Sequence, residues 1–389
     1  MMHGPARLFA LLALAAAAHA AAASERFVPT DPHFVVANVG NSMPDDDLRR
    51  KVAAWRADPD AEATTVALAS AFLARAHAAR EPMFVGRAEA VLAAVVKESR
   101  GSAAQRRLYA QTLQFRHDFA GAEALLDGVL SGNPHDASAR TLRASVRLVR
   151  GEFAAARGDC AHLVVAGDAS AAIGAACLAE ALAGSGQIER ARSLLATAPM
   201  DSSAVDPAAR AYLLTVRAEL AERTRDFASA MVDYRSALAL APDEDSIRAA
   251  FADALTLRGA VNEARALLDI DRPSVALRVR AAGLAQGSER ARLLARASEW
   301  LALEASRGDA IHNREAALLA LAAGQAPAAL AAARANFTAQ RELADVRVLA
   351  RAAVAARDAQ AQQALREWID SNGFSDAVTE ELLAGATRG

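Results

Sequence analysis

The chain has 389 residues and a formal net charge of −2, with acidic and basic residues mixed along its length. This balance disfavours a nucleic-acid-binding surface, which requires a basic patch or stripe. Hydrophobic residues make up 53% of the sequence but aromatic residues only 5%, because alanine supplies much of the apolar content. Alanine is the strongest helix former and sustained strand-like alternation is scarce, so the composition predicts an all-α protein.

Residues 1–23 are expected to be a signal peptide. A weakly basic start at His3 and Arg7 precedes the apolar run LFALLALAAAA, and an A-x-A cleavage pattern ends at Ala23, with an alternative site three residues earlier. The run is short for a membrane span, although an uncleaved anchor is the alternative. No later stretch is long and apolar enough to cross a bilayer. We therefore expect a periplasmic or secreted protein, cleaved before Ser24 and without stable membrane insertion.

Residues 24–60 are predicted to form an N-terminal arm and a capping helix. Pro29, Pro32 and Pro44 interrupt the first part, in which FVVANV has the composition of one extended piece. Three aspartates at 45–47 precede LRRKVAAWRAD, and negative charge is favourable at a helix N-terminus. We expect the arm to cover the exposed end of the first repeat, since solenoid ends need covering. A partner-binding arm is the alternative.

Residues 61–272 repeat one pattern with a period of about 34 residues, which indicates a solenoid of helix–turn–helix units. A bulky residue recurs after each turn, at Val85, Phe119, Phe153, Ile188, Phe227 and Val261. Alanines stand three residues after it, at Ala88, Ala122, Ala156, Ala191, Ala230 and Ala264, and nine residues before it, at Ala76, Ala110, Ala144, Ala179, Ala218 and Ala252. Neither helix of a unit buries its apolar face alone, so the units are expected to stack, with the bulky residue filling the gap between paired helices.

The segments VLSGNP at 129–134 and SALALAP at 236–242 resemble the closing segment of the tetratricopeptide repeat. This resemblance implies an all-α, right-handed superhelical solenoid of about eight helix pairs. The register loosens after residue 272, so residues 273–389 are expected to hold degenerate helical repeats, ending in a helix pair stopped by Asn372-Gly373. The stretch GDAIHNREAALLALAAGQAPAALAAARANFTAQRE at 308–342, and the chain as a whole, also resemble a group of uncharacterised exported tetratricopeptide proteins of proteobacteria.

In the tetratricopeptide superfamily the first helix of each unit lines a concave groove, which implies a binding surface here. Away from the packing positions, these helices carry His77, Arg107, Gln111, Gln114, Thr141, Ser145, Glu180, Thr215, Glu219 and Asp253. The best-known groove of the superfamily holds a terminal carboxylate with paired basic and amide residues. Arg107 and Gln111 supply half of such a clamp, but Thr141 and Ser145 do not complete it. We expect a mixed-charge or extended protein or peptide partner; an inner face that binds nothing is the alternative.

The two cysteines, Cys160 and Cys177, are equidistant from the centre of the turn AGDAS between two predicted helices. Adjacent antiparallel helices place them at one height, which favours a disulfide in an oxidising compartment. Two free thiols in a core are the alternative. A metal site that includes His162 is disfavoured, because residues two apart on a helix point roughly 200° apart. We expect no metal and no cofactor.

The sequence contains no G-x-S-x-G, H-E-x-x-H or phosphate-binding loop. Its densest polar cluster near the end is HNRE at 312–315, with Asn336 and QRE at 340–342. His312 and Glu315 share a helix face and suggest a hydrolase, but such clusters are more typical of networks that tie repeats together. The sequence therefore predicts a non-catalytic interaction scaffold or adaptor. An accessory or structural subunit of an exported complex is the alternative.

Overall fold

The computed structural model describes residues 46–79, 83–97, 101–167, 170–198, 205–268, 274–306 and 312–385. The predicted signal peptide and the arm up to residue 45 lie outside these ranges. The described residues form twenty helices and no strand. The helices are α1 (Asp46–Ala57), α2 (Glu62–Ala79), α3 (Met83–Lys97), α4 (Ala103–Phe115), α5 (Phe119–Gly132), α6 (Ala137–Val149), α7 (Phe153–Ala166), α8 (Ala171–Gly184), α9 (Ile188–Ala196), α10 (Pro207–Arg223), α11 (Phe227–Leu240), α12 (Asp245–Leu257), α13 (Val261–Leu267), α14 (Val275–Leu284), α15 (Gly287–Ser306), α16 (Asn313–Ala322), α17 (Ala326–Ala339), α18 (Leu343–Ala355), α19 (Ala359–Asn372) and α20 (Ala377–Gly385).

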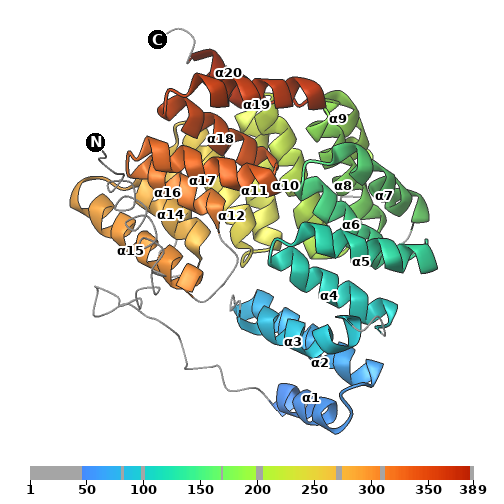
Figure 1. Ribbon diagram of the computed structural model, residues 1–389. Helices are drawn as coiled ribbons and strands as arrows, with labels where there is room; N and C mark the ends of the chain where they lie inside the picture. The colour runs from blue at the N-terminus through green and yellow to red at the C-terminus, as the bar shows by residue number, and fades with distance from the viewer. Residues whose placement is uncertain are drawn as a thin grey trace, which may run out of the picture.

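Nine helix pairs, from α2/α3 to α18/α19, form the described part of the solenoid, one more than the number predicted (Figure 1). The predicted all-α helical-repeat fold is confirmed. A single helix packs at each end: α1 against α2, and α20 against α18. Asp46 and Asp47 occupy the first turn of α1, and Leu48 joins the core of the first pair. The helix α20 was not expected, because the glycine C-cap at Gly373 was interpreted as the end of the last helix. None of the described helices is long and apolar enough to span a membrane.

The twelve recurring alanines are the regular element of the repeat. All of them are buried, with at most 7% of their surface exposed. The bulky residues vary more than predicted: Val85, Phe119 and Phe153 are buried, Ile188 and Phe227 are half-buried, and Val261 is 37% exposed. The alanines lie where paired helices touch, so a larger side chain there would push the helices apart. The bulky residue begins most second helices, at the edge of the contact, where its burial depends on the neighbouring turn.

The turns between paired helices use two kinds of chemistry. Before α7, Gly151 takes a left-handed conformation with φ of 73°, which glycine adopts without strain. Before α11, Arg225 takes the same conformation (φ 63°), and Asp226 then caps the helix by accepting a hydrogen bond from the Ser229 N–H at 3.1 Å.

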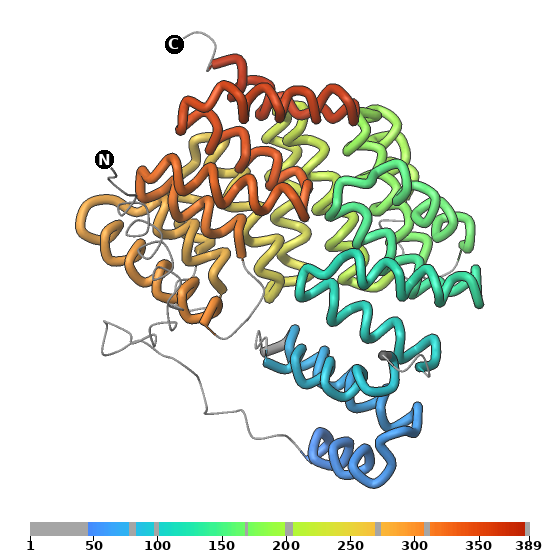
Figure 2. The backbone as a smooth tube through the Cα atoms, viewed as in Figure 1, coloured from blue at the N-terminus to red at the C-terminus, as the bar shows by residue number. Residues whose placement is uncertain are grey.

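The solenoid closes on itself, because its last helices lie against the turns of earlier repeats. Figure 2 shows α18–α20 running alongside the middle of the chain. The Arg341 N–H donates to the Val149 carbonyl at 2.7 Å, and its guanidinium donates to the Arg150 carbonyl at 2.8 Å. Near α20, the Arg223 guanidinium donates to the Ser375 carbonyl at 2.9 Å. We call this contact of α17–α20 with the ends of α6, α8 and α10 the closing seam.

A continuous hydrophobic core runs across the closing seam. It joins Leu148 and Phe153 of the third helix pair to Leu349 and Phe374 near the C-terminus. An open solenoid buries apolar surface only between sequence neighbours. The C-terminal helices therefore do more than lengthen the solenoid, because they also cover apolar residues of the middle repeats.

Candidate interaction surface

The predicted groove residues on α4 and α6 form bonds between successive first helices. The Arg107 guanidinium forms an ion pair with Asp136, the residue that caps α6. Further along, the Gln114 amide donates to the Ser145 hydroxyl at 3.0 Å. Thr141 donates back to a carbonyl of its own helix. These contacts hold neighbouring repeats in register.

The same pattern continues on the later first helices. The Tyr212 hydroxyl of α10 donates to the Glu180 carboxylate of α8 at 2.7 Å. Arg280 of α14 donates hydrogen bonds from Nε and Nη2 to the Asp253 carboxylate of α12, and the Nη2–Oδ2 distance is 2.7 Å. Thr215 donates to its own helix. The polar strip predicted as a ligand-binding surface is, over much of its length, an inter-repeat hydrogen-bond ladder.

Two predicted groove residues remain exposed, both near the N-terminus. Gln111 of α4 is exposed, and the His77 side chain at the end of α2 is 81% exposed. His77 lies 3.7 Å from a carboxylate oxygen of Glu244, at the start of α12. Figure 1 shows α2 and α4 below the part of the molecule that the closing seam covers.

Glu180 and Glu219 lie in the opposite environment, beside the closing seam. Burial raises the pKa of Glu180 to about 7, against the lowering effect of the Tyr212 hydrogen bond. Burial, and then the nearby Glu180 and Glu222 carboxylates, raise the pKa of Glu219 to about 8. Glu342, which caps α18 from across the seam, adds negative charge to both. These half-buried carboxylates lie beside the seam with raised pKa values and do not form a free acidic surface.

A buried ion-pair network holds the seam together. Arg347 of α18 forms an ion pair with the Glu222 carboxylate of α10. Its Nη2 atom also lies 2.8 Å from Oδ1 of Asp376. The Tyr234 hydroxyl donates to the other Glu222 oxygen at 2.5 Å. Arg347 and its acidic partners are almost fully buried, so loss of one partner would leave an uncompensated charge. The sequence gives no local signal for this network, since its members are far apart in the chain.

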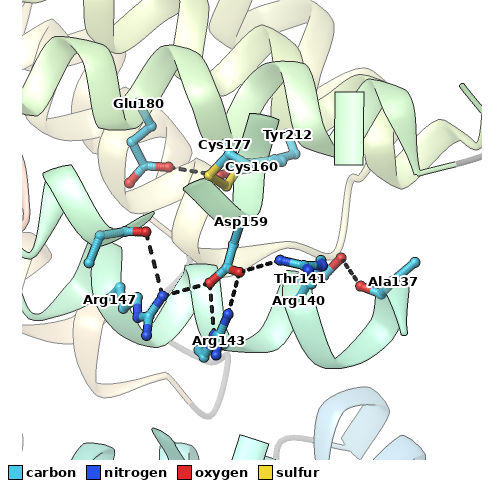
Figure 3. The surroundings of a disulfide bond; sticks show 11 residues. Ala137, Arg140, Thr141, Arg143, Arg147, Asp159, Cys160, Cys177, Glu180 and Tyr212 are labelled. Atoms are coloured by element: carbon cyan, nitrogen blue, oxygen red, sulfur yellow. Dashed lines mark hydrogen bonds and ion pairs between the residues drawn. A yellow bond between two sulfur atoms is a disulfide. The ribbon is translucent and has the colours of Figure 1, made fainter. Parts of the chain in front are cut away.

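The structure contains the predicted Cys160–Cys177 disulfide, with the Cα atoms 5.5 Å apart, joining α7 to α8. Figure 3 shows Asp159 directly beside it, facing three arginines of α6. Its buried carboxylate accepts from Arg140, Arg143 and Arg147, at distances of 2.6 to 3.0 Å. This cluster was not predicted, although Arg140, Arg143, Arg147 and Arg150 stand at helical spacing and indicate one shared face.

The polar cluster around His312 ties repeats together, as its composition suggested. Arg314 of α16 holds the Asp345 carboxylate of α18 with bonds of 2.5 and 2.9 Å, and Asn336 donates to the same group at 2.7 Å. His312 lies 3.5 Å from Glu304, whereas its Nδ1 is 4.0 Å from Glu315. In the described ranges of the chain, no group of three or more His, Cys, Asp or Glu residues is arranged to hold a metal ion.

No protein-family model and no curated protein matches the chain. Among solved structures, it is similar to the human IFIT1 dimer with m7Gppp-AAAA at 12% identity, over 88% of this chain and 72% of that one, with a TM-score of 0.41. It is similar to the tetratricopeptide repeat domain of P58(IPK) at 18% identity, over 82% and 93%, with a TM-score of 0.22. The pentatricopeptide repeat protein PPR10 from maize matches at 14% identity, over 89% and 64%, with a TM-score of 0.20. These likenesses concern helical-repeat architecture alone.

Proposed function

We propose that this protein is an exported, non-catalytic scaffold that binds a protein or peptide partner on the N-terminal part of its inner face. The observation that carries the proposal is the uneven engagement of the predicted groove. His77 and Gln111 are exposed on α2 and α4, whereas Glu180 and Asp253 are bonded to neighbouring helices. A partner therefore has access to the first repeats and not to the whole strip.

The chemistry of this part of the inner face is polar and of mixed charge. Arg107 is half-buried and paired with Asp136, so it presents a nearly neutral hydrogen-bonding surface rather than a free cation. This arrangement favours an extended segment recognised through side-chain amides and the imidazole of His77. Because Asp136 neutralises Arg107, this part of the face offers little attraction to a polyanion such as a nucleic acid.

Site-specific crosslinking tests the assignment. A photo-reactive residue at position 111 is compared with one at Glu189, an exposed residue of the second helix α9 whose side chain is 82% exposed. Both variants are exported into the native periplasm and illuminated there. We expect one stoichiometric adduct from position 111 and none from position 189.

A paired substitution supplies the second arm. His77→Ala with Gln111→Ala removes two exposed side chains and is expected to weaken capture of that partner without lowering the melting temperature. Glu189→Ala is the matched control. Equal adducts from both crosslinking positions, or a larger loss of capture with Glu189→Ala, would contradict the inner-face assignment.

A further inference from the structure

Two clefts open where two successive second helices meet the first helix between them. The first cleft, of about 480 Å³, lies between α11, α12 and α13 and is lined by Leu238, Phe251 and Leu267 together with Arg235 and Arg248. The second cleft, of about 490 Å³, lies between α17, α18 and α19. Volumes of this size accommodate large apolar groups.

The two clefts are the same site in two repeat junctions. Arg235 is the ninth residue of α11 and Arg334 the ninth residue of α17, and both line their clefts. Leu238 and Phe337 correspond in the same way, as the twelfth residues of these helices. On the following second helix, each cleft is closed by the seventh residue, which is Leu267 in α13 and Leu365 in α19.

Each cleft combines an apolar floor with a basic rim. Phe251 forms part of the first floor and is 4% exposed. Arg235 is more than half exposed and reaches Glu263 only at 3.5 Å. The Arg248 guanidinium donates to the Pro242 carbonyl at 2.7 Å.

Glu263 also lines the first cleft. The rim of the second cleft repeats only the pair of arginines. Arg334 and Arg341 line it, and no carboxylate is among its lining residues. Arg334 pairs at 3.1 Å with Asp358 just outside the lining and stays half-exposed. Arg341 lies over the Phe337 ring, 5.6 Å from its centroid, and donates to main-chain oxygen. Two guanidinium groups beside an apolar floor complement an apolar side chain flanked by carboxylates.

We propose that both clefts bind acidic amphipathic segments of a partner protein, each cleft taking one large apolar side chain while adjacent carboxylates pair with the rim arginines. This is helix-in-groove recognition. It is independent of the inner-face site on α2 and α4. Because the clefts are equivalent, one molecule takes up two copies of the segment.

A designed peptide tests this proposal on the full mature chain. The probe is a labelled helical peptide of about 14 residues, long enough to be partly helical, with Phe and Leu on one face and Glu on the other. The comparison peptide carries Lys in place of every Glu. Fluorescence anisotropy is expected to show two equivalent sites for the acidic peptide and at least about tenfold weaker binding of the basic one.

Two cleft-filling substitutions separate the sites. Ala239 and Thr338 occupy equivalent exposed positions in the two clefts, so Ala239→Trp and Thr338→Trp are each expected to remove one site. The double variant is expected to lose binding altogether. The matched controls are Ser236→Trp and Ala335→Trp, at equivalent exposed positions outside the linings, and they are expected to keep both sites.

The charge pairing has its own readout. Arg235→Ala with Arg334→Ala is expected to weaken the acidic peptide about tenfold and to flatten the salt dependence of binding. Absence of binding would overturn the proposal. So would equal affinity for the acidic and basic peptides, or binding by the Ala239→Trp, Thr338→Trp double variant. Since His77 and Gln111 lie elsewhere, their Ala variants are expected to bind the peptide normally.

Discussion

Glu219 makes the stability of this fold sensitive to alkaline pH. Burial raises its pKa from an ordinary value of 4.5 to about 8, so the folded state binds its proton more tightly than the unfolded state. Stability from this group is therefore fully present below about pH 4.5 and is lost as the pH rises towards 8. The negative groups that face it come from three helices: Glu180 of α8, Glu222 of α10 and Glu342 of α18. The nearby Arg223 partly offsets them.

The size of the effect follows from the shift. Moving one group from 4.5 to about 8 corresponds to at most about 5 kcal/mol between these pH values. Because the Glu219 side chain is partly exposed, solvent screening reduces this to about 2–3 kcal/mol. Glu180 titrates in the same direction with its pKa raised to about 7, so the loss of stability is expected to be steepest between about pH 5 and 7, where both groups are protonated in the folded state and ionised in the unfolded state.

Urea unfolding of the wild type and Glu219→Gln at a series of pH values from about 5 to 9 measures this directly. The amide stays neutral, so the variant is expected to resemble the wild type at low pH and to be about 2–3 kcal/mol more stable than it at high pH. Glu189→Gln, an exposed residue on α9, is the control and is expected to leave the pH profile unchanged. Parallel profiles for wild type and Glu219→Gln, or a variant that loses stability mainly at high pH, would refute this reasoning.

Three further predictions concern the repeat core, the disulfide and export. Phe153→Ala is expected to cost about 3–5 kcal/mol and Phe227→Ala roughly half as much, because Phe153 is buried and Phe227 is half-buried; equal costs in chemical unfolding would contradict this ranking. The Cys160–Cys177 bond is expected to contribute about 3 kcal/mol through its short loop; two free thiols in non-reducing mass spectrometry of exported protein would exclude it. N-terminal sequencing of fractionated protein is expected to begin near Ser24, and an intact Met1 in the cytoplasm would contradict export.

Local features of the fold were predictable from sequence because local chemistry determines them. The alanine positions reflect contacts within one or two repeats. Even so, burial of the bulky residue was less regular than expected: Val261, which begins the 7-residue helix α13, is 37% exposed.

The closing seam could not be predicted, and it changes the meaning of the predicted site. The pairing of Arg347 with Glu222 spans 125 residues, and that of Arg341 with Arg150 spans 191. No periodicity marks such pairs. Glu180 and Glu219 were correctly placed on the first helices, yet a position on the inner helix implies solvent exposure only if the solenoid stays open. By contrast, the spacing of the arginines on α6 is visible in the sequence. Their cluster would have been predicted if Asp159 had been recognised as their buried partner.

Closure divides the molecule into two parts with different physical behaviour. In an open solenoid, stability is a sum of nearest-neighbour terms, so repeats can open one after another. From α6 onward, the closing seam adds contacts between distant repeats, which raises the cost of opening any one of them and makes unfolding more cooperative. The helices α1–α4 have fewer such ties, since His77 and its exposed neighbours contact the rest of the fold through isolated pairs. The exposed part of the inner face thus lies on α1–α4, the helices best able to adjust to a partner. The closed part of the solenoid, from α6 onward, forms the rigid support for these helices.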